Sequence, residues 1–129
     1  MLVLDASALA SWLMPDESGV DLVDLAAQHE IFTAPWLIWA EIRNILVFSE
    51  RRGRIASGVS DQVLEAIGRL GIVLDTDPSN TVVMALARTH GLTAYDAVYL
   101  ELALRQRAVL ATHDAALKRA ASAEGVALA

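Results

Sequence analysis

Short apolar runs alternate along the chain with longer stretches in which apolar residues recur at helical spacing. The short runs predict four buried strands, over residues 2–5, 31–34, 72–75 and 108–112. The stretches between them predict helices over residues 6–14, 17–29, 35–52, about 60–70, from the "TDPS" segment to about 90, 93–107 and 114–124, and residues 126–129 fit a short edge strand. Pro35 suits the first turn of the long third helix, and Gly91 suits the end of the fifth.

This alternation predicts an α/β fold, in which a central parallel sheet of four to five strands is flanked by helices on both faces. A length of 129 residues suits one domain, and the sequence contains neither an internal repeat nor a linker. Ligands of such sheets bind beyond the carboxyl ends of the strands. Residues that directly follow the predicted strands are therefore the first candidates for a functional site.

One acidic residue interrupts an apolar helix face in the segment "LTAYDAVYLELA", residues 92–103. Helical spacing places Asp96 on the face formed by Leu92, Tyr99, Leu100 and Ala103. Thr93 and Asp96 also fit a capping box, with Thr93 as the N-cap. Capping accounts for a polar residue near the helix start, but it does not account for the alignment of Asp96 with apolar residues.

A second acidic residue lies among apolar neighbours in "PWLIWAEIRNILVF". The residues three and four positions from Glu41 are Leu37, Ile38, Asn44 and Ile45. An exposed position remains an alternative, because Arg43 and Arg51 lie on the same predicted helix. Burial of an unpaired carboxylate costs several kcal/mol or forces its protonation, so a buried Glu41 needs a partner.

Two further acids follow predicted strands: Asp5 after the first and Asp114 after the fourth. N-capping is the ordinary structural explanation for each, because a helix follows both. Taken together, however, two acids at strand ends and two on apolar helix faces could line one cleft. Their charges would repel one another, and divalent cations relieve such repulsion. Oxygen-only ligands select hard ions such as Mg²⁺ or Mn²⁺.

Composition and charge restrict the remaining choices. The chain has no cysteine, which excludes disulfides, thiolate zinc sites and a cysteine nucleophile, and a reducing cytoplasm is the simple interpretation. No segment has the length and apolarity of a membrane span, and the first residues lack the basic start of a signal peptide. The net charge of −6 argues against a sequence-blind DNA binder but not against a nucleic-acid enzyme, whose bound cations would neutralise its carboxylates.

Four segments, in order, resemble the PIN domain and in particular the VapC-type ribonuclease toxins of toxin–antitoxin pairs. They are "VLDASALASWL" with Asp5, "AEIRNIL" with Glu41, "LTAYDAVYLELAL" with Asp96 and "LATHDAAL" with Asp114. The resemblance covers almost the whole chain and implies one PIN domain over residues 1–129. It also implies that these four acids are the catalytic residues and metal ligands. We expect Asp5 and Asp96 to hold the main ion, and Glu41 and Asp114 to complete a second site or to orient water.

The same resemblance implies an endoribonuclease that depends on Mg²⁺ or Mn²⁺, forms a homodimer and binds a cognate antitoxin. Toxins of this kind cut tRNA or ribosomal RNA at defined sites. Ser7 and Thr112 match hydroxyl positions beside the four acids, where they would orient water or a carboxylate, although each also fits ordinary helix-start or strand-end chemistry. The chain departs from some relatives at Ala115 and Ala116, where those relatives carry a further acid.

Several other residues have two interpretations. Arg51, Arg52 and Arg54 form the densest basic cluster, which would either grip RNA phosphates or be a solvated loop. His113 would either touch substrate or be an exposed strand-end residue. The tryptophans at positions 12, 36 and 39 are interpreted as core or interface anchors. Asp75 and Asp77 are interpreted as a turn and a helix cap.

Two other functions stay open at this point. A metal-dependent phosphatase also uses an aspartate at a strand end, but the phosphoaspartate type has a second acid two residues later, where this chain has Ser7. The chain could also be a catalytically inactive PIN-like module that binds a protein partner. The complete set of four acids argues against that alternative.

Overall fold

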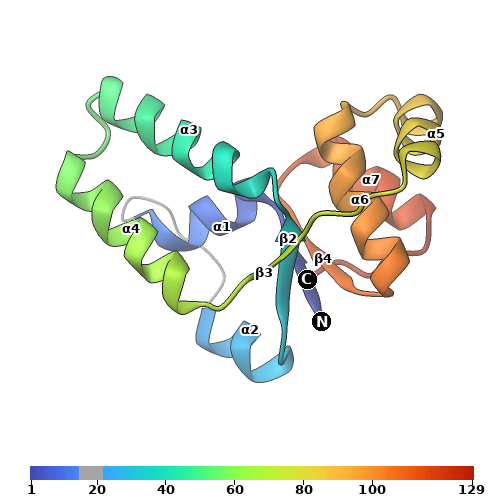
Figure 1. The fold of residues 1–129 in the computed structure, drawn as a ribbon, viewed down its shortest axis with the longest axis horizontal. Helices are drawn as coiled ribbons and strands as arrows, with labels where there is room; N and C mark the ends of the chain where they lie inside the picture. The colour runs from blue at the N-terminus through green and yellow to red at the C-terminus, as the bar shows by residue number, and fades with distance from the viewer. Residues whose placement is uncertain (15–21) are drawn as a thin grey trace.

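The computed structural model describes residues 1–14 and 22–129 (Figure 1). Its strands are β1 (Leu2–Leu4), β2 (Phe32–Pro35), β3 (Val73–Asp75) and β4 (Val109–Ala111). Its helices are α1 (Ala6–Leu13), α2 (Leu22–Gln28), α3 (Ile38–Arg51), α4 (Ser57–Arg69), α5 (Asn80–His90), α6 (Ala94–Gln106) and α7 (Ala115–Ala123). The predicted alternation is confirmed, and the part of the predicted helix 17–29 that precedes residue 22 lies outside the described residues.

The described strands form one parallel sheet in the order β3-β2-β1-β4. Leu4 at the end of β1 pairs with Ala111 at the end of β4, so the connections that follow these two strands begin side by side. β2 runs from α2 up to α3 in Figure 1, and the carboxyl ends of the strands therefore form the upper edge of the sheet. The predicted edge strand at 126–129 is reduced to one isolated bridge, between Leu110 and Leu128.

Helices cover both faces of the sheet, as predicted. Figure 1 shows α1 to α4 on one side of the strands and α5 to α7 on the other. α6 contacts β1, β2 and β4, and its apolar face is buried there through Tyr99, Leu100, Leu102 and Ala103. Removal of that face from water is the main reason for its position, because burial of each large apolar side chain contributes roughly 1.5–3 kcal/mol.

The three helices that begin at or near Asp5, Asp96 and Asp114 have side-chain caps. Asp5 accepts a hydrogen bond from the backbone N–H of Ala8, and Asp114 accepts one from Leu117. Thr93 caps α6 through the N–H of Asp96. The capping explanations given for these residues are therefore correct, and each cap also fixes its side chain at the edge of the sheet.

Two sequence predictions are wrong in detail. Pro35 ends β2 instead of beginning α3, and the N–H of Trp36 then donates to the carbonyl of Asp75. A strand end tolerates proline because no further ladder donor is needed there. Ser79, not Asp75 or Asp77, caps α5.

The structure separates the two alternatives given for the tryptophans, which were core or interface anchors. Trp36 and Trp39 expose 55% and 57% of their surfaces, so neither is a core residue. Trp12 packs partly buried against the core. None of the helices within the two described ranges has the combination of length and apolarity needed to cross a membrane.

Candidate active site

The carboxylate of Asp5 is held by donors from two connections that are far apart in the chain. Asp5 is 4% exposed. Its Oδ1 accepts from the Ser7 hydroxyl at 2.7 Å and from the Ala8 N–H at 2.8 Å. Its Oδ2 accepts from the Thr112 hydroxyl. Both carboxylate oxygens of this buried side chain therefore have hydrogen-bond donors.

Backbone hydrogen bonds join the same two connections. The N–H of Asp114 donates to the Thr112 hydroxyl oxygen at 3.0 Å, and the N–H of His113 donates to the Ser7 hydroxyl oxygen at 3.1 Å. The Asp5 N–H donates to the Ala111 carbonyl at 3.1 Å. Asp5 and Asp114 are thus fixed relative to each other through Ser7 and Thr112, the hydroxyl residues that the sequence placed beside the acids.

His113 contributes a side-chain link that the sequence did not reveal. Its Nε2 lies 2.8 Å from the Ser11 hydroxyl oxygen, and that hydroxyl donates to the Ala8 carbonyl at 2.9 Å. A hydroxyl has a single proton, so Ser11 accepts from His113, and the imidazole proton is assigned to Nε2. His113 is exposed, which agrees with one of its two interpretations, and its ring is hydrogen-bonded to α1 through Ser11.

Glu41 reaches the same edge from α3. Its side chain is half-buried, and the Tyr99 hydroxyl donates to its Oε1 at 2.7 Å. Burial raises the pKa of Glu41, the Tyr99 hydrogen bond lowers it, and the negative charges of Asp5 and Asp96 raise it further. Burial and the bond to Glu41 raise the pKa of Tyr99, which therefore stays protonated and donates.

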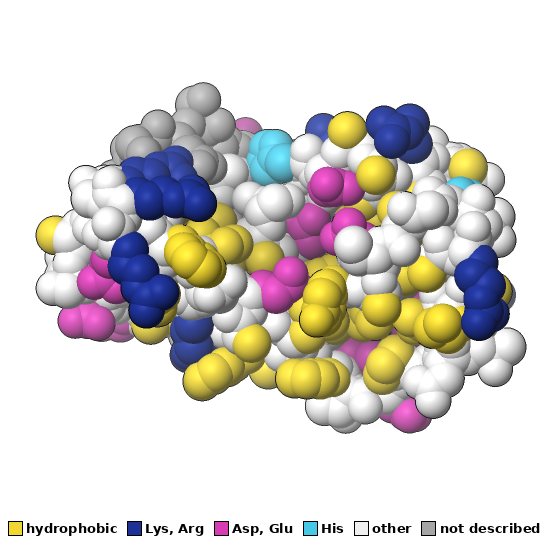
Figure 2. Space-filling model, turned by 90° about the horizontal axis from the view of Figure 1, so that it is seen from above, with side chains coloured by type: hydrophobic (Ala, Val, Ile, Leu, Met, Phe, Trp, Pro, Cys, Tyr) yellow, Lys and Arg dark blue, Asp and Glu magenta, His cyan; other side chains and the backbone are white. Residues whose placement is uncertain are grey.

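Asp96 completes the set from the first turn of α6. Burial raises the pKa of its carboxyl group, and the charges of Asp114 and Asp5 raise it further, while the Thr93 hydroxyl lowers it. Each of the four predicted acids therefore interacts electrostatically with at least one other. Figure 2 shows acidic side chains gathered in the middle of the face seen from above, with hydrophobic side chains beside them and basic side chains nearer its edges.

The chemistry of these donors fits a hard divalent cation. All donors are carboxylate or hydroxyl oxygens, and the mutual repulsion of the acids is what a cation would offset. Over residues 1–14 and 22–129, no three His, Asp or Glu side chains converge closely enough to form a coordination sphere as they stand. The site therefore fits a divalent cation in the type of its donor atoms and in its negative charge, and not in the spacing of those atoms.

The predicted basic cluster lies away from the acids. Arg51 ends α3, ten residues after Glu41, which corresponds to about 15 Å along the helix. Arg51, Arg52 and Arg54 are exposed, and the guanidinium groups of Arg51 and Arg52 lie 5.8 and 5.9 Å from the centre of the Phe48 ring. The structure does not bring these arginines together with the carboxylates.

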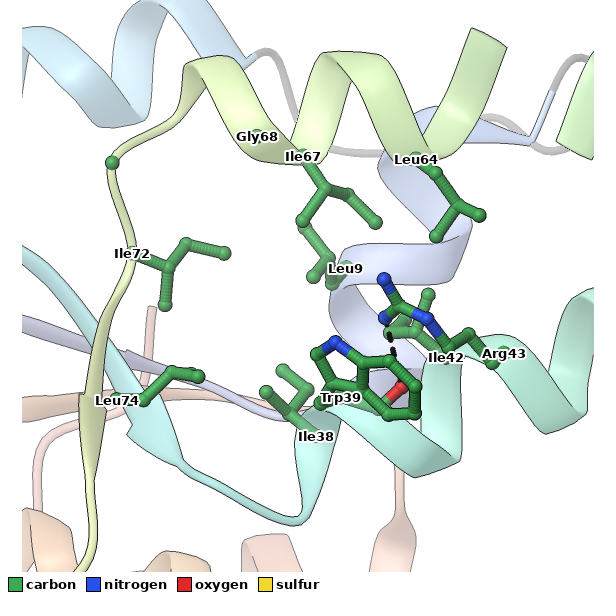
Figure 3. Close-up of a pocket in the computed structure, with 11 residues that line it drawn as sticks. Leu9, Ile38, Trp39, Ile42, Arg43, Leu64, Ile67, Gly68, Ile72 and Leu74 are labelled. Carbon is green, nitrogen blue, oxygen red and sulfur yellow. Dashed lines mark hydrogen bonds between the residues drawn. The ribbon is translucent and has the colours of Figure 1, made fainter. Parts of the chain in front are cut away.

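A separate pocket of about 250 Å³ lies between α1, α3, α4 and β3 (Figure 3). Aliphatic side chains form most of its wall, including Leu9, Ile42, Ile67 and Leu74. At its mouth the Arg43 guanidinium stacks 3.6 Å from the centre of the Trp39 ring and donates to the Trp39 carbonyl. The pocket offers no carboxylate, so the acidic edge is the better candidate for phosphate chemistry.

Comparison with known proteins assigns the fold to a family. Residues 2–123 match the PIN domain, and the chain belongs to the PIN-domain family. It is 31% identical over 116 residues to Ribonuclease VapC3 from Pyrobaculum aerophilum, with 88% of each chain covered. The resemblance seen in the sequence is therefore confirmed at the level of the family.

Solved structures agree with this assignment. The structure of PAE2754 from Pyrobaculum aerophilum has a TM-score of 0.69 and 28% identity, and the match covers 92% of this chain and 78% of that one. FitAcB from Neisseria gonorrhoeae has a TM-score of 0.65 over 99% of this chain and 96% of that one. Its identity of 20% shows likeness of fold alone.

Proposed function

We propose that this protein is an endoribonuclease that requires Mg²⁺ or Mn²⁺ and is the toxin of a toxin–antitoxin pair. The observation that carries the proposal is the electrostatic coupling of Asp5, Glu41, Asp96 and Asp114 at the carboxyl edge of a PIN-domain sheet. Kinship with Ribonuclease VapC3 supports RNA as the substrate. We propose tRNA or ribosomal RNA as the RNA class, and the cytoplasm as the compartment.

In this proposal Asp5 and Asp96 hold the main ion, and Glu41 and Asp114 complete a second site or orient the attacking water. A bound divalent ion supplies positive charge to the reacting phosphate and lowers the pKa of water. Ser7 and Thr112 keep the Asp5 carboxylate in one orientation, through the bonds that both hydroxyls donate to it. Direct attack by water on the phosphodiester would leave a 5′-phosphate.

Protein partners form the other part of the proposal: a cognate antitoxin and a second copy of the chain. Trp36, Trp39 and Tyr95 expose apolar surface at the starts of α3 and α6. A protein partner would remove this surface from water, which is consistent with the high mean hydropathy of +0.43.

The test is cleavage of purified tRNA and ribosomal RNA, followed by mapping of the new ends. We expect cleavage with Mg²⁺ or Mn²⁺, products with 5′-phosphates, and loss of cleavage with a chelator or in Asp5→Asn. Cleavage that persists in both conditions, or that leaves cyclic phosphates, would contradict the proposal.

The phosphatase alternative has less support. The position of its second acid is Ser7, which donates a hydrogen bond to Asp5 and is already engaged there. Hydrolysis of a phosphomonoester, without RNA cleavage, would favour it. An inactive binding module would show neither activity but would still bind a protein partner.

A further inference from the structure

Tyr99 is the polar side chain most deeply enclosed beside the acidic edge. It is 1% exposed and packs in the face of α6 that covers the sheet. A buried phenol needs a hydrogen-bond partner for its hydroxyl group. Here the partner is Oε1 of Glu41, at 2.7 Å, on a different helix.

The hydroxyl of Tyr99 lies where three elements meet. Tyr99 follows Asp96 by three residues on α6, so both side chains lie on one face of that helix. The backbone of Ala6, the residue after Asp5, interacts with the same hydroxyl group. Glu41 reaches it from α3. Tyr99 thus lies beside three of the four acids: it contacts Glu41, shares a helix with Asp96 and interacts with the residue that follows Asp5.

Glu41 has few other constraints in the described residues. Among residues 1–14 and 22–129, the hydrogen bond to its carboxylate is the one from Tyr99 to Oε1, and its side chain has several rotatable bonds. Asp5, by contrast, has both oxygens engaged. The bond from Tyr99 therefore engages one oxygen of Glu41 and leaves the other without a donor from the described residues, while the charges of Asp5 and Asp96 act on the same carboxyl group.

We propose that Tyr99 is a positioning residue that anchors Glu41 through Oε1 and presents Oε2 to a divalent cation shared with Asp5 and Asp96. The inference rests on the proposed metal-dependent function and assigns Tyr99 a role in it. The ring supplies packing and the hydroxyl supplies orientation, so the two contributions can be separated by Tyr99→Phe.

The experiment is a titration of the full-length chain with Mn²⁺, in which free Mn²⁺ is followed by electron paramagnetic resonance. Loss of a residue that orients a metal ligand typically weakens metal affinity 10–100-fold, and we expect Tyr99→Phe to raise the Kd for Mn²⁺ by about tenfold. The matched control is Tyr95→Phe, because Tyr95 lies on the same helix and is 66% exposed. Its Kd should equal that of wild type.

A double-mutant cycle tests whether the effect passes through Glu41. In the Glu41→Gln background, Tyr99→Phe should change the Kd by less than about twofold, because the oriented carboxylate is already gone. An equal loss in both backgrounds would overturn the proposal. A lower thermal midpoint for Tyr99→Phe with an unchanged Kd would also overturn it, because the role would then be structural only.

The outcomes also separate this inference from the proposed function. If wild type binds no Mn²⁺ and cleaves no RNA, both proposals fail. If wild type does both and Tyr99→Phe matches it in Kd and in kcat, only the role of Tyr99 fails.

Discussion

The helix α6 carries two acids, the partly buried Asp96 and the buried Glu101, and the charged groups near these two acids differ in sign. Glu101 is 2% exposed, and both of its oxygens are engaged. Oε1 accepts from Arg105 Nε at 2.8 Å and from the Ser79 N–H at 3.4 Å, and Oε2 accepts from Arg105 Nη2 at 3.1 Å. This carboxylate is compensated by a cation and by a backbone donor.

The same arginine also pairs with the end of β3. Arg105 donates to both oxygens of Asp75, at 3.0 and 2.7 Å, and the pKa of Asp75 is lowered mainly by these hydrogen bonds. The cluster thereby ties α6 to β3 and to the start of α5. One guanidinium is shared by two carboxylates, so each of these acids has a cation as its hydrogen-bond partner, which is the pattern of a structural ion pair.

Asp96 is surrounded differently. Burial raises the pKa of Asp96 most, and its charged neighbours, the acids Asp114 and Asp5, raise it further. Burial is also the largest cause that raises the pKa of Glu41, and the charges of Asp5 and Asp96 raise it further. Because Glu101 is also buried, the contrast indicates that the sign of the neighbouring charges separates a structural acid from a candidate functional one.

The largest expected effect comes from neutralising an acid of the uncompensated group. We expect Asp96→Asn to reduce RNA cleavage by about 10³-fold, because several kcal/mol of transition-state stabilisation depend on the cation that this carboxylate would help to hold. The free energy of unfolding should stay the same or rise, because a repulsive charge is removed. Single-turnover cleavage and urea unfolding of the same preparation measure the two quantities.

A control for that experiment is Asp61→Asn on α4, an exposed acid outside the group. It removes the same formal charge and should leave cleavage unchanged. A large loss of stability in Asp96→Asn, with activity per folded molecule retained, would contradict the comparison.

The second-largest effect is expected at Glu101, where a substitution should lower stability and leave activity unchanged. We expect Glu101→Gln to lower the free energy of unfolding by about 2 kcal/mol, because it weakens the charge-assisted hydrogen bonds of a buried side chain, while Arg105 keeps its pair with Asp75. Cleavage per folded molecule should be near that of wild type. The midpoint of urea unfolding measures the first quantity.

Glu65→Gln is the matched control. Glu65 pairs with Arg69 at 3.3 Å, but both side chains are 71% exposed, so this bridge contributes little. If both substitutions shift the midpoint equally, the compensated cluster on α6 has no special structural role.

Much of this arrangement was predictable from local pattern. Strand ends, helix spacing and cap residues identified the α/β sheet and drew attention to Asp5, Asp96 and Asp114. Those signals depend on residues near one another in the chain, which a sequence displays directly. Glu41 was singled out because its helical neighbours were apolar, and its enclosed position agrees with that reasoning.

Contacts between distant segments were not predictable in the same way. The bond between Ser11 and His113 joins residues 102 positions apart, and the Tyr99–Glu41 bond joins residues 58 apart. Asp75 was interpreted as part of a turn because its partner, Arg105, lies 30 positions away. One signal was available for Tyr99: a phenol on a buried helix face requires a partner, and Asp96 lies three residues before it.

The smallest expected effect is a difference in the pH dependence of stability between the two groups of acids. Where a folded-state pKa is raised, the folded protein binds more protons than the unfolded chain between the ordinary and the raised value. Its stability therefore falls as pH rises through that window. For Glu41 and Asp96 the windows open at the ordinary values of 4.5 and 3.8 and extend upward.

The pH dependence due to Asp75 has the opposite sign, because its pKa is lowered. Its contribution to stability is complete above pH 3.8 and is lost as pH falls through the lowered pKa.

Thermal midpoints measured in chelator across these pH windows should therefore respond differently to two variants. In wild type, stability should decline as pH rises above 4.5, and this decline should be absent from the double variant Glu41→Gln/Asp96→Asn. Wild type should also lose stability as pH falls below 3.8, and this loss should be smaller in Asp75→Asn. Added Mg²⁺ should offset the decline in wild type, because a cation favours the ionised carboxylates, and should have no such effect in the double variant. Identical pH profiles for wild type and both variants would mean that the two groups of acids do not differ in electrostatic compensation.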